Sequence, residues 1–294
     1  VVGNINLNRG ANYAMLESTY TGTGILSNTS IVGSTLTRNN ESTLAIRGHH
    51  LGANAGTRTQ FRIATAGESP FIAANAIGGT GLAGSSELKI IPWIVAQNLG
   101  ATTNALITTS NVQSGNSLTT YTTGLGFRAL DFTSEYVNFS DAALYAGSAL
   151  KNVRESLNAS DASVSASATV NGLVLDNANT TTARNLTGVG TGVSLKVNSG
   201  AILFTALDSS FNAQSPPLAQ GMTVSGFDAG ITTETGEYII FQNNLSTAGV
   251  TISSDLTSAA KLTKSGLGTL ILSGNNSALT DVTLNEGVVQ VSSL

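Results

Sequence analysis

The stretch "KSGLGTLILSGNN", from Lys264 to Asn276, decides how this chain folds. Three glycines, Gly266, Gly268 and Gly274, bracket one short apolar run, Leu270-Ile271-Leu272. The run is too short and too often interrupted by glycine for a helix, and its spacing is too regular for an unstructured loop. Glycine adopts positive φ without a Cβ penalty, so a chain of this kind turns sharply and begins a new strand. The stretch therefore predicts short strands joined by tight corners.

The same pattern returns elsewhere in the C-terminal half of the chain. Residues 197–204, "VNSGAILF", align with residues 284–291, "LNEGVVQV", and both read apolar-Asn-x-Gly-x-apolar-x-apolar. Residues 170–175, 236–241 and 268–272 carry parts of this pattern. Internal echoes at intervals of roughly 20 to 35 residues are typical of stacked-repeat proteins, in which neighbouring repeats bury each other's apolar faces. The predicted fold class is therefore all-β, with a parallel β-helix (β-solenoid) as its architecture.

We expect residues 1–294 to form a single elongated β-helix segment. Residues 1–130 are predicted to form less regular coils, residues 131–163 an excursion, and residues 164–294 regular repeat coils. The excursion is richer in alanine and charge and predicts short helical turns near 134–157. Because the chain opens at Val1 in strand-like sequence without an initiator methionine, we expect an interior or processed piece of a longer chain.

Period-2 alternation of apolar residues also predicts strands in the first 130 residues. These predicted strands are residues 5–7, 14–16, 25–26, 31–32, 44–46, 61–63, 71–72, 88–91, 94–95 and 106–107.

The composition narrows the classes of function. Hydrophobic residues make up 41% of the chain and charged residues only 10%, against about 25% charged residues in an ordinary globular domain. The net charge is −4, and the basic residues form no cluster along the sequence, so no nucleic-acid partner is expected. No apolar run reaches the roughly 18 residues of a membrane span. With no cysteine, the chain has no thiolate chemistry or disulfides.

The C-terminal residues resemble a known family. "LTKSGLGTLILSGNNSALTDVTLNEGVVQV", residues 262–291, is similar to the autotransporter-associated β-strand repeat of bacterial surface proteins, which reads Lys-x-Gly-x-Gly-Thr-Leu-x-Leu-Ser-Gly-x-Asn, then a Thr-rich bend, a strand, Asn-x-Gly and another strand. The usual Tyr-x-Gly after the Asn is replaced by Ala278-Leu279-Thr280, which leaves the strands intact. Segments 38–52, 90–96 and 124–137 more loosely resemble very long repeat proteins of planctomycete and verrucomicrobial type.

The resemblance implies a right-handed parallel β-helix, an extracellular or cell-surface place, and a non-catalytic role as a stalk, fibre or adhesin-like rod. The partners that it implies are further copies or further repeats of the same chain, stacked end to end, with surface glycans or neighbouring cells as targets. No cofactor and no metal are expected. Two alternatives stay open: a carbohydrate-binding or carbohydrate-degrading β-helix protein, and a phage-type fibre.

The residues that we expect to carry the function are structural. The predicted corner residues are Gly200, Gly266, Gly268, Gly274 and Gly287. The predicted core residues are Ile202, Phe204, Leu270, Leu272, Leu284, Val289 and Val291.

Few residues suggest chemistry. His49-His50, beside Arg47, are the only histidines, and a polar corner is favoured over half of a metal site because zinc needs about four ligands. Glycoside hydrolysis uses two carboxyl groups that flank one bond. The pairs Asp131 with Glu135 and Asp141 with Glu155 could be proposed, but their spacing favours solvated loop charges.

Two further features favour a structural role. Gly78-Gly79-Thr80-Gly81 resembles a calcium-binding glycine-rich repeat but lacks its aspartate, so a plain turn is expected. Trp93, the only tryptophan, is predicted to pack over the coils rather than to form a sugar platform.

Overall fold

The chain forms two compact units, each with its own sheets. The computed structural model describes residues 2–16, 20–21, 24–25, 28–53, 58–99, 115–147, 150–179, 181–206 and 220–292. Unit 1 comprises Val1–Ala76 and Ile90–Leu130, and unit 2 comprises Ile77–Lys89 and Asp131–Leu294. The tertiary contacts therefore divide the chain differently from the single elongated segment that the sequence predicts.

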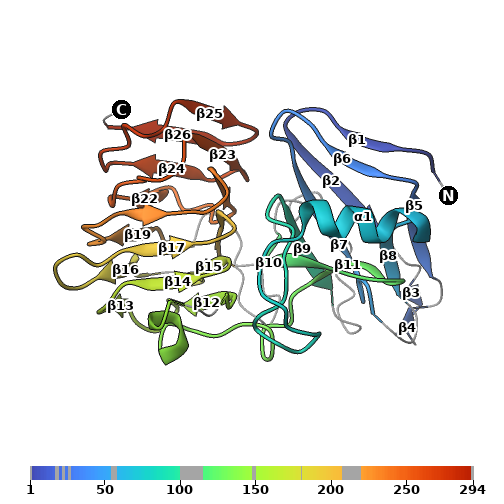
Figure 1. Ribbon diagram of the computed structural model, residues 1–294, viewed down its shortest axis with the longest axis horizontal. Helices are drawn as coiled ribbons and strands as arrows, with labels where there is room; N and C mark the ends of the chain where they lie inside the picture. Colours follow the sequence, from blue (N-terminus) through green and yellow to red (C-terminus); the bar gives the residue numbers. More distant parts are fainter. Residues whose placement is uncertain are drawn as a thin grey trace. The chain divides into compact units, whose positions relative to one another are not determined.

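Unit 1 is built on a mixed five-stranded sheet of order β11-β10-β9-β7-β2 (Figure 1). Strands β2, β7 and β9 pair in parallel, whereas β9, β10 and β11 pair antiparallel. Three two-stranded sheets, β1-β6, β5-β8 and β3-β4, complete the unit. The bounds of its elements are β1 Ile5–Leu7, β2 Ala11–Leu16, β3 Tyr20–Thr21, β4 Gly24–Ile25, β5 Thr29–Gly33, β6 Leu36–Arg38, β7 Thr43–His49, β8 Thr59–Ile63, α1 Thr65–Asn75, β9 Ile94–Leu99, β10 Ser117–Thr122 and β11 Gly126–Ala129.

An aromatic cluster forms the core of unit 1. The ring of Phe71, on α1, lies 5.5 Å from that of Phe127 and 6.3 Å from that of Trp93, both in edge-on geometry. Glu68 is buried on the same helix, and its Oε1 accepts hydrogen bonds from the Tyr121 hydroxyl and the Gly124 amide, each at 3.0 Å. Trp93 is therefore a core residue of unit 1. Edge-on contacts between aromatic rings add to the stability that the core gains from burying apolar surface.

Unit 2 contains three parallel sheets. Sheet 1 has the order β12-β15-β18-β21-β23-β25, sheet 2 the order β13-β16-β19-β22-β24-β26, and sheet 3 the order β14-β17-β20. The strands are β12 Val153–Ser156, β13 Ala162–Val164, β14 Ala168–Val170, β15 Leu173–Asp176, β16 Arg184–Gly188, β17 Leu195–Val197, β18 Ala201–Thr205, β19 Met222–Ser225, β20 Ile231–Thr232, β21 Glu237–Gln242, β22 Val250–Ile252, β23 Lys261–Ser265, β24 Thr269–Leu272, β25 Asp281–Leu284 and β26 Val288–Val291.

Successive strands of unit 2 enter the three sheets in rotation. The chain passes from β12 in sheet 1 to β13 in sheet 2 and β14 in sheet 3, and returns to sheet 1 at β15. After β20 an isolated parallel bridge between Ile231 and Leu256 takes the place of a strand in sheet 3. Within unit 2 the strands lie above one another in chain order (Figure 1). One circuit of the sheets therefore pairs with the next throughout.

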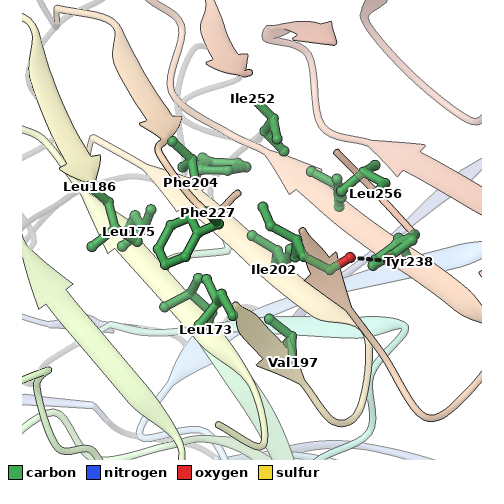
Figure 2. Close-up of a cluster of buried hydrophobic side chains, with 14 of the residues drawn as sticks. Leu173, Leu175, Leu186, Val197, Ile202, Phe204, Phe227, Tyr238, Ile252 and Leu256 are labelled. Carbon is green, nitrogen blue, oxygen red and sulfur yellow. Dashed lines mark hydrogen bonds between the residues drawn. The ribbon is translucent and has the colours of Figure 1, made fainter. Parts of the chain in front are cut away.

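Constant register converts this pairing into continuous rows of side chains. In sheet 2 one row runs through Ala162, Leu186, Val224, Ile252, Leu272 and Val291. In sheet 1 another row runs through Val153, Leu173, Ile202, Ile240, Lys264 and Leu284. The apolar members of these rows meet across the sheets, and Figure 2 shows Leu173, Ile202, Phe204, Phe227 and Ile252 in this core.

The described part of the chain is predominantly β, and the pairing in unit 2 is parallel, which agrees with the predicted all-β class.

Three details differ from the prediction. Residues 71–72 belong to helix α1, because Phe71 packs into the aromatic cluster of unit 1 and the neighbouring alanines favour helix. Residues 88–91 form no strand. The described part of the excursion holds one short 3-10 helix, Ala142–Tyr145, and then contains strand β12 and the start of β13. The predicted strand 106–107 lies outside the described residues.

The predicted corner glycines act in two ways. Gly200, Gly266 and Gly287 have positive φ, between 73° and 78°, which side chains other than glycine rarely adopt. Gly268 and Gly274 also lie at bends of the chain, but neither has positive φ. A Cβ at Gly274 would lie 2.7 Å from the Ser254 carbonyl oxygen, and one at Gly268 would collide with the Asn244 carbonyl. These two glycines are required because neighbouring circuits approach closely.

Replacing Gly200 with alanine should destabilise the protein more than replacing Gly236 with alanine. Both residues have positive φ, 73° and 72°, so each substitution imposes backbone strain of about 1 kcal/mol. Only at Gly200 would the new Cβ collide with a backbone atom, the Glu237 carbonyl oxygen of the next circuit, whereas the space around Gly236 is open. We expect a loss of about 3 kcal/mol for G200A, measured by urea unfolding. Equal losses would contradict the close approach of the circuits.

Leu270→Ala should cost about 2 to 5 kcal/mol of unfolding free energy, because Leu270 is fully buried in the core. Leu284→Ala, at a side chain that is 51% exposed, should cost less than about 1 kcal/mol. Urea unfolding of both variants checks this difference, and a small loss for L270A would show that Leu270 is not a core residue.

Candidate functional site

The most distinctive feature of the motif region is a buried lysine. Lys264 lies on β23, in the core-facing row of sheet 1, where it is paired with Ile240 of the preceding strand β21. Its side chain is inaccessible to solvent. Its Nζ donates hydrogen bonds to the carbonyl oxygens of Gly266, Gly268 (2.6 Å) and Glu286 (2.8 Å). The first two acceptors belong to the corner after β23, and the third belongs to the corner of the next circuit. The lysine therefore ties two successive circuits together.

This lysine explains the spacing of the glycines around it. A Cβ at Gly287 would collide with the Lys264 Nζ and would lie 2.5 Å from the Gly266 carbonyl oxygen. A Cβ at Gly266 would lie 2.6 Å from the Gln242 carbonyl oxygen. The ammonium group has three donors, and three carbonyls accept them, which satisfies its hydrogen-bonding capacity. The lysine and the glycines of the motif thus form one structural unit.

Burial lowers the pKa of Lys264 to about 8, and the negative charge of Glu286 partly opposes this shift. The unfolded chain keeps the ordinary lysine pKa of 10.5. Between these two values the unfolded chain binds more protons than the folded chain, so this residue should make the protein more stable as the pH rises.

Buried amides cap the same kind of corner in earlier circuits. The Gln242 side-chain amide donates to the carbonyl oxygens of Asn244 (2.9 Å) and Thr269 (3.0 Å). The Asn177 amide donates to three carbonyls, those of Thr182, Gln220 and Gly221, at 3.2 to 3.3 Å. Sequence reasoning missed these caps, because isolated Asn and Gln residues in an Asn-rich chain give no signal until the fold places them at a corner.

The last strands of sheets 1 and 2 expose apolar side chains. Val282 and Leu284 on β25, and Val289 and Val291 on β26, continue the core-facing rows of the preceding strands. We call these four residues the end patch. Val282, Leu284 and Val291 are 42–51% exposed, and Val289 is partly buried against the core. Because β25 and β26 are edge strands, the end patch presents an apolar surface in register with the core.

The predicted core residues divide according to this arrangement. Ile202, Phe204, Leu270 and Leu272 are buried. The placement of Leu284 and Val291 in the core is corrected, because no strand of the described residues pairs with the outer edge of β25 or β26.

The four carboxylates that the sequence predicts to be solvated loop charges form local hydrogen bonds, and the burial of Glu135 corrects that prediction for this residue. Glu135 is buried, and its two oxygens accept from the amides of Gly84 and Asp131, both at 2.8 Å. Asp131 accepts hydrogen bonds from the Thr133 hydroxyl and from the Thr133 and Ser134 amides, and these bonds lower the pKa of its carboxyl. This pair therefore shapes a loop.

The carboxylates of the second pair have different partners. The Asp141 carboxylate is 2.7 Å from the Lys151 Nζ, and this hydrogen bond lowers the pKa of Asp141. Glu155 accepts from the Phe139 amide at 2.9 Å, and burial raises the pKa of its carboxyl. Asp141 and Glu155 thus belong to different hydrogen-bonding groups.

The histidines show no metal-site arrangement. His49 is buried on β7, and His50 follows it with a φ of 47°. Across the part of the chain that the structure describes, no group of three or more His, Cys, Asp or Glu side chains could hold a metal ion. The turn at Gly78-Gly79-Thr80-Gly81 packs against Asn171 and Glu87 of unit 2.

No protein-family model, curated protein or solved structure matches this chain. The family resemblance of residues 262–291 therefore stays a prediction. Among the described residues, no helix has the length and apolar character needed to cross a membrane.

Lys264→Met should destabilise unit 2 by about 2 to 3 kcal/mol near pH 7, because it leaves three buried carbonyls without their donor. The difference in unfolding free energy between the wild type and K264M should increase from pH 8 to pH 10, as the folded lysine loses its proton. Urea unfolding at several pH values checks both effects. A difference that does not change with pH would show that Lys264 keeps its ordinary pKa.

Proposed function

We propose that this chain is a segment of a right-handed parallel β-helix in a bacterial cell-surface or extracellular protein, built from autotransporter-associated repeats. Its role is structural and non-catalytic: a rigid stalk, fibre or adhesin-like rod. The similarity of residues 262–291 to the repeat supports the family. The rotation of the chain through three parallel sheets supports the architecture.

The physical basis of the rod is the repeated pairing of circuits. Each circuit of unit 2 donates and accepts backbone hydrogen bonds along its sheets, and each adds one residue to the same apolar rows. Stability in such an array is the sum of contributions from neighbouring repeats, so the array can lengthen without a new kind of core.

The end patch is the observation that carries the proposal. It is apolar, it lies on two edge strands, and its side chains have the register of the buried rows beneath them. The occupant that fits it is a further circuit of the same repeat, because only a parallel strand in the same register would continue both the backbone pairing and the side-chain rows.

The degrading form of the carbohydrate-active alternative is less well supported. Glycoside hydrolysis requires two carboxyl groups facing one bond. The four carboxylates considered for that role bind loop amides or a lysine.

Duplication of the repeat tests whether the end patch accepts a further circuit. We would insert a second copy of residues 273–292, which span one circuit from the corner before β25 to the end of β26, directly after Ser292. Leu284 of the first copy should then become buried, so that Leu284→Ala costs about 2 to 5 kcal/mol in the extended chain. The same substitution in the original chain should cost less than about 1 kcal/mol. Urea unfolding of the four proteins gives the comparison.

A matched control replaces Leu82 with alanine in both chains. Leu82 is 83% exposed and lies outside the end patch, so its substitution should have the same small effect with or without the added circuit. If Leu284→Ala stays mild in the extended chain, the end patch does not receive another circuit.

The biological role is tested on the native polypeptide that carries this sequence, by intact mass and negative-stain images of one sample. A very large chain seen as a long rod, or a small chain that assembles into fibres, would support a structural rod. Isolated compact particles would overturn it.

A further inference from the structure

A cavity of about 600 Å³ opens beside the first strands of sheet 1, within unit 2. Part of its lining comes from the segment 132–141, and the rest comes from β12, β15 and Asn158, which follows β12. This volume lies in the range of roughly 300 to 1,000 Å³ that small-molecule sites occupy. The cavity belongs to no part of the end patch or of the Lys264 corner.

Aromatic side chains line one part of this cavity. The rings of Phe132 and Tyr136 lie 6.3 Å apart with a tilt of 39°, and both line the cavity. The Arg154 guanidinium lies over the Phe132 ring, 4.1 Å from its centroid. The stacked guanidinium helps to fix the position of the Phe132 ring, so this part of the lining is preformed.

The charges that line the cavity are paired. Arg154 Nη2 lies 2.9 Å from the Asp176 carboxylate, and both side chains are more than nine-tenths buried. Ser156 and Asn158 donate to the other Asp176 oxygen at 3.1 Å and 3.0 Å. The lining therefore holds one guanidinium and two carboxylates, and each is already paired, because Asp141 forms its own ion pair with Lys151 at 2.7 Å.

This combination selects a class of ligand. The charges of the lining are already paired, Arg154 with Asp176 and Asp141 with Lys151, so a charged ligand would have to compete with an existing ion pair. A neutral ligand with many hydroxyl groups can both donate to the carboxylates and accept from the amides and the guanidinium, while its apolar C–H face packs on Phe132. We propose that the cavity is a binding site for a neutral saccharide of one to a few sugar rings.

The site binds and does not hydrolyse. On β12, Arg154 and Ser156 line the cavity, and Glu155 points to the opposite face because side chains alternate along a strand. The raised pKa of Glu155 would suit a general acid, but its carboxylate accepts from the Phe139 amide away from the cavity lining. A rod with such a site could hold a surface glycan without degrading it.

Saturation-transfer NMR with millimolar neutral sugars tests the proposal. The probes are glucose, galactose, mannose, N-acetylglucosamine and their common disaccharides, with glucuronate as the acidic comparison. We expect transfer to at least one neutral sugar and none above background to glucuronate. The variant Ser156→Trp, which places a large side chain in the cavity, should abolish the signal.

The control is Ser163→Trp, since Ser163 is also an exposed serine on an edge strand but lies on β13, outside the cavity lining. Thermal unfolding of both variants verifies that they fold, and the milder Asn158→Ala should weaken binding if Ser156→Trp does not fold. The proposal is overturned if no neutral sugar binds, if Ser156→Trp binds as well as Ser163→Trp, or if only glucuronate binds. None of these results bears on whether the end patch accepts a further circuit.

Discussion

Parallel pairing in a constant register is the constraint on which unit 2 depends. The row from Ala162 to Val291 passes through six strands without a slip. A slip of one residue would turn every side chain of a strand to the opposite face, because the period of a strand is two. The apolar core of unit 2 therefore exists only as long as each circuit begins at the correct residue.

Corners set where each circuit begins, and this is why buried polar groups are found there. A sharp corner leaves backbone carbonyls inside the protein, and each must find a donor. Lys264, Gln242 and Asn177 supply these donors in three different circuits of the stack. Of the three, Lys264 has the strictest requirements, because burying a charged ammonium group is costly unless all its hydrogen-bond donors have acceptors. It also needs space, which the neighbouring glycines provide.

The two candidate interaction surfaces lie where the regular stacking stops. At β25 and β26 the rows continue to the surface and form the end patch. At β12 the segment 132–141 departs from the repeat, and the space between it and the first strands becomes the cavity. The first surface suits more of the same structure, since it repeats the core pattern. The second suits a different molecule, since its groups are varied and fixed.

The sequence by itself determined the character of the repeat. Gly266, Gly287 and the alternating Leu270 and Leu272 predict short strands, tight corners and a stacked β architecture, because local φ preferences and period-2 patterns are written in neighbouring residues. Only the tertiary structure decided which residues meet across long separations. Arg154 on β12 and Asp176 on the neighbouring strand β15 form an ion pair, and Lys264 reaches the corner of the next circuit. The helix at Phe71 and the exposure of Leu284 were likewise decided by packing, since burial depends on what covers a residue and not on the residue alone.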